Sequence, residues 1–182
     1  ETDAAGTLTI PRARLRHPAA RAFVAMASLC AAGTARPPRS ERAERLAERL
    51  AGEGTVALTL CGARIEADDL AVRFLRDAGE AERHGFPDLT AGPDGAVWDG
   101  RFEIFSEQPL LVRGVNSLRG RLPREIRTAL GAFAPKVREG LPIGIHSDGE
   151  LQLLVGQPPG AQVRALAYGR LLAACGAVSR EP

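Results

Sequence analysis

The first third of the chain has apolar residues at helical spacing. Between residue 18 and about residue 32, apolar side chains occupy nearly every side, which predicts a buried helix ended by Gly33. A second helix is predicted over about 41–51, where the i, i+3, i+4, i+7 pattern is carried by Ala43, Leu46, Ala47 and Leu50. We therefore expect residues 18–51 to form a helical hairpin, preceded by a short strand at 7–10.

After Gly54 the period of the apolar positions changes to two, which is the spacing of a half-buried strand. Alternating segments at 55–60, 63–66 and 70–75 predict a β-hairpin or meander. Residues 77–96 are polar and rich in Gly, Pro and Asp, so we expect a long loop there. Long loops of this kind are often functional or mobile.

The single tryptophan lies in a stretch, residues 97–105, that combines a turn with strand alternation. Asp99-Gly100 is typical of a tight turn, and after it Phe102 faces one side of the strand while its neighbours face the other. Aromatic residues make up only 4% of the chain. We therefore expect Trp98 and Phe102 to anchor this strand in the core.

The rest of the chain shows short elements separated by segments that contain Gly and Pro. We expect a strand at 110–114, a basic loop at 115–122, a short helix from Pro123, a hairpin joining 142–145 to 151–155, and a helix over 163–174. Together the patterns predict an α+β fold, with an N-terminal helical hairpin followed by a small, mainly antiparallel sheet with short helices. The expected division is a helical linker subdomain at 1–54 and an α+β C-terminal subdomain at 55–182.

The charged residues nearly balance, with 24 Lys and Arg against 22 Asp and Glu and a formal net charge of +2. This total does not by itself indicate a nucleic-acid-binding protein. The type of basic residue is more informative, because Lys136 is the single lysine and the other basic residues are arginines. That bias is explained either by a GC-rich coding sequence or by a need for guanidinium groups, which suit phosphate and base edges better than lysine does.

The sequence contains no recognisable catalytic motif. A phosphate-binding glycine loop is missing. His146, Ser147 and Asp148 are neighbours in one turn, whereas the members of a catalytic triad converge from separate segments. No apolar run reaches the roughly 18 residues that a membrane span requires. We therefore predict no catalytic residue in this chain and no membrane association.

The three cysteines are far apart and form no Cys-x-x-Cys or Cys/His cluster. This spacing argues against a zinc site and a disulfide framework, and it fits a reducing cytoplasm. Cys30 and Cys175 fall in apolar helical patterns and are expected in the core. Cys61 follows a predicted strand and is the cysteine to test for reactivity. We predict no metal site.

Arginines in or beside loops are the remaining functional signal. Guanidinium groups and loop amides are the groups that contact phosphates when a protein docks on RNA. The candidate RNA-binding residues are Arg76, Arg101, Arg113, Arg119, Arg121, Arg124 and Arg127. The alternative is that they are surface arginines without a ligand.

Several short motifs occur in an order that is typical of one protein family. They are Pro37-Pro38-Arg39, Glu44-Arg45-Leu46, Thr59-Leu60-Cys61-Gly62-Ala63-Arg64-Ile65, Arg76-Asp77, Val97-Trp98-Asp99-Gly100-Arg101-Phe102, Leu122-Pro123, Ile126-Arg127 and Ala173-Ala174-Cys175-Gly176. In these motifs the chain resembles the C-terminal part of bacterial tRNA(Ile)-lysidine synthases, which are PP-loop ATPases. It departs from the family pattern at Cys61, Ala63 and Asp77, where the family has Gly, Cys and Glu.

The resemblance implies a division of labour within a longer enzyme. In the family, cytidine 34 of tRNA(Ile) is activated with ATP, and lysine then attacks to give lysidine. The sites for ATP, Mg and lysine lie in an N-terminal PP-loop domain. We expect this chain, which starts without Met, to be the tRNA-docking fragment, with tRNA and that N-terminal domain as partners. It would hold no cofactor of its own and would be inactive alone.

Two alternatives stay open. The chain could be a structural or dimerisation module, a possible homodimer that braces the catalytic domain without touching RNA, and the near-zero net charge favours this view. It could also be a small independent enzyme that uses Cys61, which would require a thiolate at neutral pH.

Overall fold

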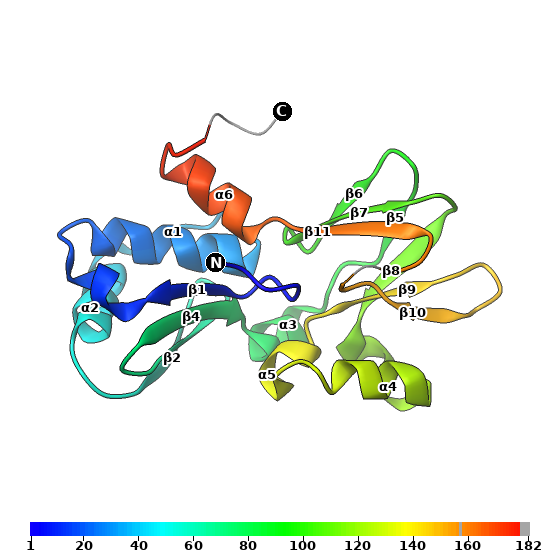
Figure 1. Ribbon diagram of the computed structural model, residues 1–182, viewed down its shortest axis with the longest axis horizontal. Helices are drawn as coiled ribbons and strands as arrows, with labels where there is room; N and C mark the ends of the chain where they lie inside the picture. Colours follow the sequence, from blue (N-terminus) through cyan, green and yellow to red (C-terminus); the bar gives the residue numbers. More distant parts are fainter. Residues whose placement is uncertain (157, 179–182) are drawn as a thin grey trace. The chain divides into compact units, whose positions relative to one another are not determined.

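The computed structural model describes residues 1–156 and 158–178, and the chain divides into two compact units (Figure 1). Unit 1 comprises Glu1–Asp77 and Leu166–Pro182, and unit 2 comprises Ala78–Ala165. Helices and antiparallel sheets occur in both units, so the predicted α+β class is confirmed.

Unit 1 packs helices against a four-stranded antiparallel sheet with the order β1-β4-β3-β2. Its strands are β1 (Leu8–Pro11), β2 (Val56–Leu60), β3 (Ala63–Ala67) and β4 (Ala71–Arg76). Its helices are the 3₁₀ helix η1 (Arg12–Arg16), α1 (Ala20–Ala32), α2 (Ser40–Ala51) and α6 (Ala167–Ala174). Helix α1 contacts α2, α6, β3 and β4, so segments from both ends of the chain share one core.

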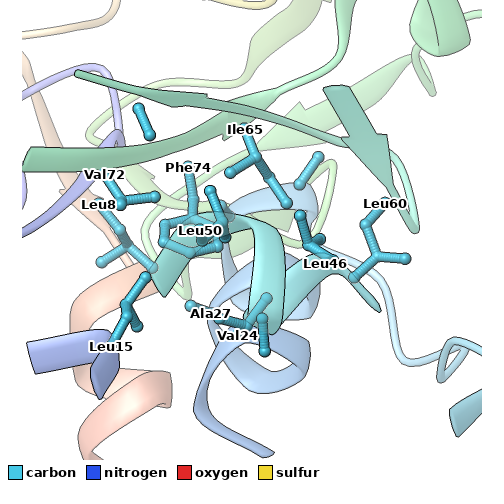
Figure 2. Packing of buried hydrophobic residues seen from close by; sticks show 14 of the residues in the cluster. Leu8, Leu15, Val24, Ala27, Leu46, Leu50, Leu60, Ile65, Val72 and Phe74 are labelled. Atoms are coloured by element: carbon cyan, nitrogen blue, oxygen red, sulfur yellow. The ribbon is translucent and has the colours of Figure 1, made fainter. Parts of the chain in front are cut away.

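The core of unit 1 is aliphatic around one fully buried phenylalanine, Phe74. Figure 2 shows Leu8, Leu50 and Ile65 close to this ring, with Val24 of α1 below. The predicted stripe of α2 is buried as expected, because its apolar residues recur on one face of the helix. The contact between α1 and α2 agrees with the expected pairing of the two helices, although β1 and η1 precede them.

Strands β2 and β3 form a hairpin with a two-residue turn. Leu60 pairs with Ala63, and the residues between them, Cys61 and Gly62, both have positive φ values of 51° and 79°. Two consecutive residues with positive φ match the twist of a tight hairpin, and glycine adopts this conformation without strain. Cys61 is therefore a turn residue whose backbone position is set by the hairpin.

Unit 2 contains two antiparallel sheets. The first has the order β10-β9-β8-β5 and consists of β5 (Leu89–Ala91), β8 (Leu110–Gly114), β9 (Pro142–Ile145) and β10 (Leu151–Leu153). The second has the order β11-β7-β6 and consists of β6 (Ala96–Trp98), β7 (Phe102–Ser106) and β11 (Ala161–Ala165). The helical elements are α3 (Ala78–His84), the 3₁₀ helix η2 (Val115–Arg121), α4 (Arg124–Leu130) and α5 (Pro135–Arg138).

The Trp98 stretch forms the β6–β7 hairpin. Trp98, Phe102 and Ile104 are fully buried, as the alternation predicts. Asp99 and Gly100 have φ values of 48° and 62°, and the amide of Arg101 donates to the carbonyl of Trp98 at 3.0 Å. Trp98 stacks on Phe86 with ring centroids 5.0 Å apart, and its indole Nε1 donates to the carbonyl of Pro87 at 2.8 Å. The predicted anchoring role of this stretch is confirmed.

Four predictions differ from the structure. The basic loop expected at 115–122 is largely the 3₁₀ helix η2. Residues 77–96 are not one loop, because they contain α3, β5 and the start of β6. The helix expected over 163–174 begins only at Ala167, because residues 161–165 form β11 and pair with β7. The strands form three sheets where one small sheet was expected.

The compact units also divide the chain at a different place from the expected boundary after residue 54. Strands β2, β3 and β4 follow that position, yet buried residues of these strands lie in the same core as those of α1 and α2. The division falls after Asp77, and the last helix returns to unit 1.

Candidate nucleic-acid interface

The predicted basic loop and helix form one surface of unit 2, which we call the η2–α4 surface (residues 115–130). Val115 and Leu118 of η2 and Ile126 and Leu130 of α4 are buried. Ile126 and Leu130 are four residues apart and therefore lie on the same helix face. Because these apolar side chains point inward, the intervening basic residues face solvent.

Three of the predicted arginines are exposed on the η2–α4 surface: Arg121, Arg124 and Arg127. Within the part of the chain that the structure describes, no hydrogen bond or ion pair holds their guanidinium groups. Arg124 and Arg127 are neighbours on α4, since residues three apart have Cβ atoms about 5 to 6 Å from each other. Glu125 is the single acidic residue between 119 and 127. The surface thus presents unpaired positive charge.

Arg119 was predicted to belong to the same group. Its backbone lies in η2, but its side chain lies outside the described residues.

Two further basic residues of unit 2 are held by acceptors of their own unit. Arg113 of β8 forms a two-pronged ion pair with Asp88, with N–O distances of 2.6 and 3.1 Å. Arg138 of α5 donates to the carbonyl of Phe133 at 2.7 Å and to that of Gly131 at 3.3 Å. Arg138 therefore fixes the segment that follows α4, whereas Arg113 is a predicted contact residue that is already paired.

Arg101 was predicted to touch RNA, but its side chain is only 3% exposed. Its Nε donates to the Asp99 carboxylate at 2.7 Å, and Nη2 donates to the carbonyl of Gly140. The guanidinium carbon lies 4.9 Å from the centroid of the Phe102 ring and 5.8 Å from that of Trp98. These contacts place Arg101 in the aromatic core of unit 2, so we leave it out of the η2–α4 surface.

Arg76, the remaining predicted contact residue, lies in unit 1 at the end of β4. It is half-buried, and its Nη1 donates to the carbonyl of Gly62 at 3.2 Å.

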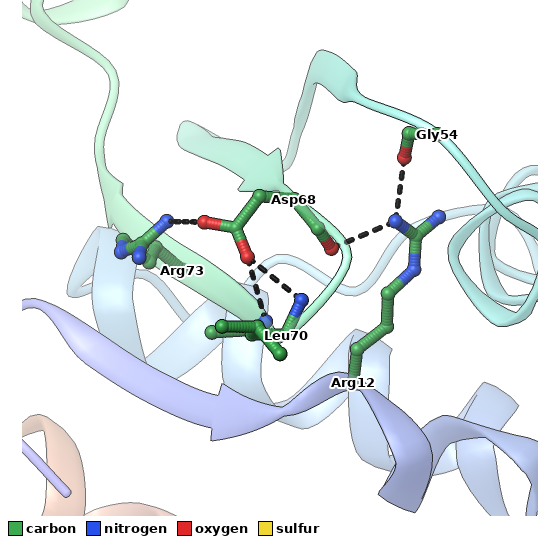
Figure 3. A network of polar contacts seen from close by, with 6 residues as sticks. Arg12, Gly54, Asp68, Leu70 and Arg73 are labelled. Carbon is green, nitrogen blue, oxygen red and sulfur yellow. Dashed lines mark hydrogen bonds and ion pairs between the residues drawn. The ribbon is translucent and has the colours of Figure 1, made fainter.

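Arg12 was not among the residues predicted to be functional. It is 95% buried, and it donates to the carbonyls of Leu50 (2.9 Å), Gly54 (2.5 Å) and Asp68 (2.7 Å). Figure 3 shows its guanidinium reaching Gly54 and Asp68.

Arg12 and Leu15 are three residues apart in a helix with three residues per turn, so they share the buried face. That spacing to an apolar residue is the signal that distinguishes Arg12 from exposed Arg14 and Arg16.

A comparison with known proteins shows what the chain is similar to. The chain is 42% identical over 192 aligned residues to tRNA(Ile)-lysidine synthase from Caulobacter vibrioides. The match covers the whole of this chain and the C-terminal 45% of that protein. The chain resembles the C-terminal region of tRNA(Ile)-lysidine synthases. The resemblance drawn from the short motifs is thereby confirmed.

The chain spans less than half the length of the tRNA(Ile)-lysidine synthase that it matches. No family model matches it, and no solved structure matches it.

Apart from these arginines, the described residues provide few groups suited to metal binding or to nucleophilic chemistry. Residues 1–156 and 158–178 contain no group of three or more His, Cys, Asp or Glu that could hold a metal ion. None of the described helices is long and apolar enough to cross a membrane. Burial raises the pKa of the Cys30 thiol, which disfavours the thiolate. Cys175 was expected in the core but is exposed at the end of α6.

Proposed function

We propose that this chain is the tRNA-binding and tRNA-positioning portion of a cytoplasmic tRNA(Ile)-lysidine synthase. The observation that carries the proposal is the group of exposed, unpaired arginines Arg121, Arg124 and Arg127 on the η2–α4 surface. The similarity to a tRNA(Ile)-lysidine synthase supports tRNA as the ligand. In the full-length enzyme, ATP-dependent ligation of lysine to cytidine 34 would take place in an N-terminal domain that binds ATP, Mg and lysine.

The chemistry of the surface fits a sugar–phosphate backbone. A guanidinium group is planar and always charged, and its donors match the oxygens of a phosphate in pairs. Arg124 and Arg127 project from neighbouring positions on α4, and Arg121 precedes that helix by three residues. Contacts of this kind fix the position and register of a nucleic acid without reading its sequence. The surface would therefore hold tRNA in place for chemistry that occurs elsewhere.

Binding can be tested by titrating the chain with tRNA in a filter-binding assay at low and high salt. We expect tRNA to bind more tightly than an uncharged polymer, with an affinity that falls as salt rises because counterions are released from the phosphates. The variant Arg121→Glu/Arg124→Glu/Arg127→Glu should bind at least about tenfold more weakly. It should also show a shallower dependence on salt, by up to about one unit of log–log slope for each lost phosphate contact.

A matched control changes the same amount of charge in unit 1. Arg14, Arg36 and Arg39 are exposed there, and their replacement by Glu alters the net charge by the same amount. This control should retain most of the tRNA affinity. An equal loss in both triple variants would mean that binding follows total charge and not the η2–α4 surface. Failure of the unmodified chain to prefer tRNA over the uncharged polymer would reject the proposal.

A second function, a structural or dimerisation module, is favoured by the near balance of charge, which is +2 overall. Light scattering on the chain distinguishes the two functions. A stable dimer that shows no affinity for tRNA would support the module, whereas a monomer that binds tRNA would support the tRNA-binding function.

A further inference from the structure

The outer face of the sheet β11-β7-β6 carries a distinct set of side chains, which we call the Phe105 face. Phe105 pairs across the strands with Gln162, Glu103 pairs with Arg164, and Val97 pairs with Glu103. Paired residues in antiparallel strands point to the same side of a sheet. Phe102 and Ile104, which alternate with these positions on β7, are fully buried on the opposite face.

Two hollows lie on the Phe105 face, and Phe105 and Gln162 line both of them. One measures about 440 Å³ and is also lined by Pro93, Glu107 and Gly160. The other measures about 450 Å³ and is also lined by Glu103, Val163 and Arg164. The ring of Phe105 is partly exposed, whereas Phe102 on the same strand is fully buried.

The ring of Phe105 is held in position by the turn between β5 and β6. Gly95 in that turn has a φ of 76°, and a Cβ atom added to it would lie 2.4 Å from Cε1 of Phe105. Only glycine leaves room for the ring at this approach. The amides of Gly95 and Ser106 both donate to the carbonyl of Gly92, at 3.1 Å each, and this fixes the turn against β7. The ring is therefore pre-positioned.

The Phe105 face carries no surplus positive charge. Arg164 donates to the Glu103 carboxylate at 2.8 and 2.9 Å, and Glu107 adds a negative charge at the rim of one hollow. A phosphate group would find no surplus positive charge there. Gln162 is exposed and offers both an amide donor and a carbonyl acceptor next to the ring. An aromatic ring with an adjacent side-chain amide, and without surplus positive charge, suits a flat, uncharged ring that has hydrogen-bonding groups on its edge.

We propose that the Phe105 face binds one unpaired RNA nucleobase, which stacks on Phe105 and hydrogen-bonds with the amide of Gln162. Unstacked bases of single-stranded RNA are commonly bound in this way, by an aromatic side chain and a polar edge contact. The proposal rests on the proposed tRNA-binding function and adds to it a second kind of contact. The η2–α4 surface would bind the phosphate backbone of the RNA through its positive charge, and the Phe105 face would bind a base by stacking.

The test uses two fluorescently labelled RNA hairpins with the same stem, one with blunt ends and one with a short unpaired overhang. A flexible linker without nucleotides replaces the loop of each hairpin, so that only the overhang offers unpaired bases. Binding of the 182-residue chain is followed by fluorescence anisotropy at fixed low salt. We expect the unmodified chain to bind the overhang hairpin more tightly. Phe105→Leu should weaken binding of that hairpin about tenfold, which is within the range for loss of one stacked base. It should leave binding of the blunt hairpin unchanged.

Three variants act as controls. Phe105→Tyr keeps the ring and should retain the affinity for the overhang. Val97→Ala changes the same sheet face at a residue that is 45% exposed, and Tyr168→Leu removes an aromatic side chain that is 42% exposed in unit 1. Both should behave like the unmodified chain. Circular dichroism of each variant establishes that it is folded.

The outcomes separate the two proposals. If the chain binds neither hairpin, the proposed function and this inference both fail. If it binds both hairpins but Phe105→Leu has no more effect than Val97→Ala, only the nucleobase site is rejected. Equal weakening of both hairpins by Phe105→Leu would also reject it, since a stacking site discriminates between them.

Discussion

Unit 1 and unit 2 each contain one buried arginine among their described residues, and the two are held in different ways. Arg12 of unit 1 donates to three backbone carbonyls, at distances of 2.5 to 2.9 Å. Arg101 of unit 2 is paired with the carboxylate of Asp99, bonded to a carbonyl and surrounded by aromatic rings. The first arginine links three segments of backbone, and the second pairs with a largely buried carboxylate.

The difference follows from what each core offers. The core of unit 1 is mainly aliphatic, and its buried cation is satisfied by backbone carbonyls. The loop after α2 and the turn between β3 and β4 supply that backbone through Gly54 and Asp68. Unit 2 gathers Trp98, Phe86 and Phe102, whose ring faces attract a cation. The two buried arginines of this chain are therefore structural residues.

The largest predicted effect is that of removing the cation in unit 2. Arg101→Met removes the ion pair with Asp99, whose side chains are only 3% and 9% exposed, and breaking a pair of this kind costs about 3 to 5 kcal/mol. Trp98 is the single tryptophan and is fully buried in unit 2, so its fluorescence reports the unfolding of that unit. We expect the urea midpoint measured by this fluorescence to fall strongly.

The matched control for Arg101→Met is Arg113→Met. Arg113 belongs to the same unit but pairs with Asp88 at the surface, where such pairs contribute less than about 1 kcal/mol. A second variant, Arg101→Met/Asp99→Asn, removes both charges and should recover part of the lost stability. Equal midpoints for Arg101→Met and Arg113→Met would show that Arg101 is not buried in solution.

A smaller effect is expected for Arg12→Met in unit 1. This change removes hydrogen bonds to three carbonyls, which we expect to cost about 2 to 3 kcal/mol. It leaves no charged group unpaired, and Nη2 of Arg12 already lies buried without a hydrogen-bond partner among the described residues. Both facts make the loss smaller than for Arg101. Far-UV circular dichroism measures the loss, because most helical residues lie in unit 1.

Arg14→Met is the control for Arg12→Met, since Arg14 is exposed on the same 3₁₀ helix. It should leave stability within about 0.5 kcal/mol of the unmodified chain. If the two variants were equally stable, the carbonyl contacts of Arg12 would contribute nothing.

The sequence predicted those elements in which the apolar pattern extends over several residues and does not depend on distant parts of the chain. The α2 stripe and the strands of the β2–β3–β4 meander were expected within about two residues of their observed ends. The short strands β5 and β11 were missed, because they are strands only through pairing with distant residues. Val163, for example, lies three residues before Leu166 and so imitates a helical stripe, but it pairs with Ile104 of β7.

The candidate site was predictable to a similar extent. The exposed arginines of the η2–α4 surface follow from a loop and helix that the sequence indicates. The burial of Arg101 does not follow, because one of its acceptors is the carbonyl of Gly140, 39 residues further along the chain. The Phe105 face was also missed, since it depends on β11 lying beside β7.

The turn between β3 and β4, whose Asp68 carbonyl accepts a hydrogen bond from Arg12, is also held by the Asp68 side chain. One carboxylate oxygen of Asp68 accepts hydrogen bonds from the amides of Leu70 and Ala71, both at 2.9 Å, and the other pairs with Arg73 at 2.7 Å. Figure 3 shows these contacts beside the bond from Arg12 to the Asp68 carbonyl. The hydrogen bond from Arg73, followed by those from the two amides, lowers the pKa of Asp68 from 3.8 to about 2.

The smallest predicted effect is therefore a dependence of unit 1 stability on acid. Because the pKa of Asp68 is lower in the folded chain than in the unfolded chain, the charged carboxylate stabilises the fold above pH 3.8, and this contribution is lost as the pH falls towards about 2. Asp68→Asn keeps an oxygen for the turn amides but removes the charge. The difference in urea midpoint between the two chains should be constant near neutral pH and should close across that interval. A carboxyl NMR titration that placed the pKa of Asp68 near 3.8 would show that Arg73 does not hold it, and the gap would then not close.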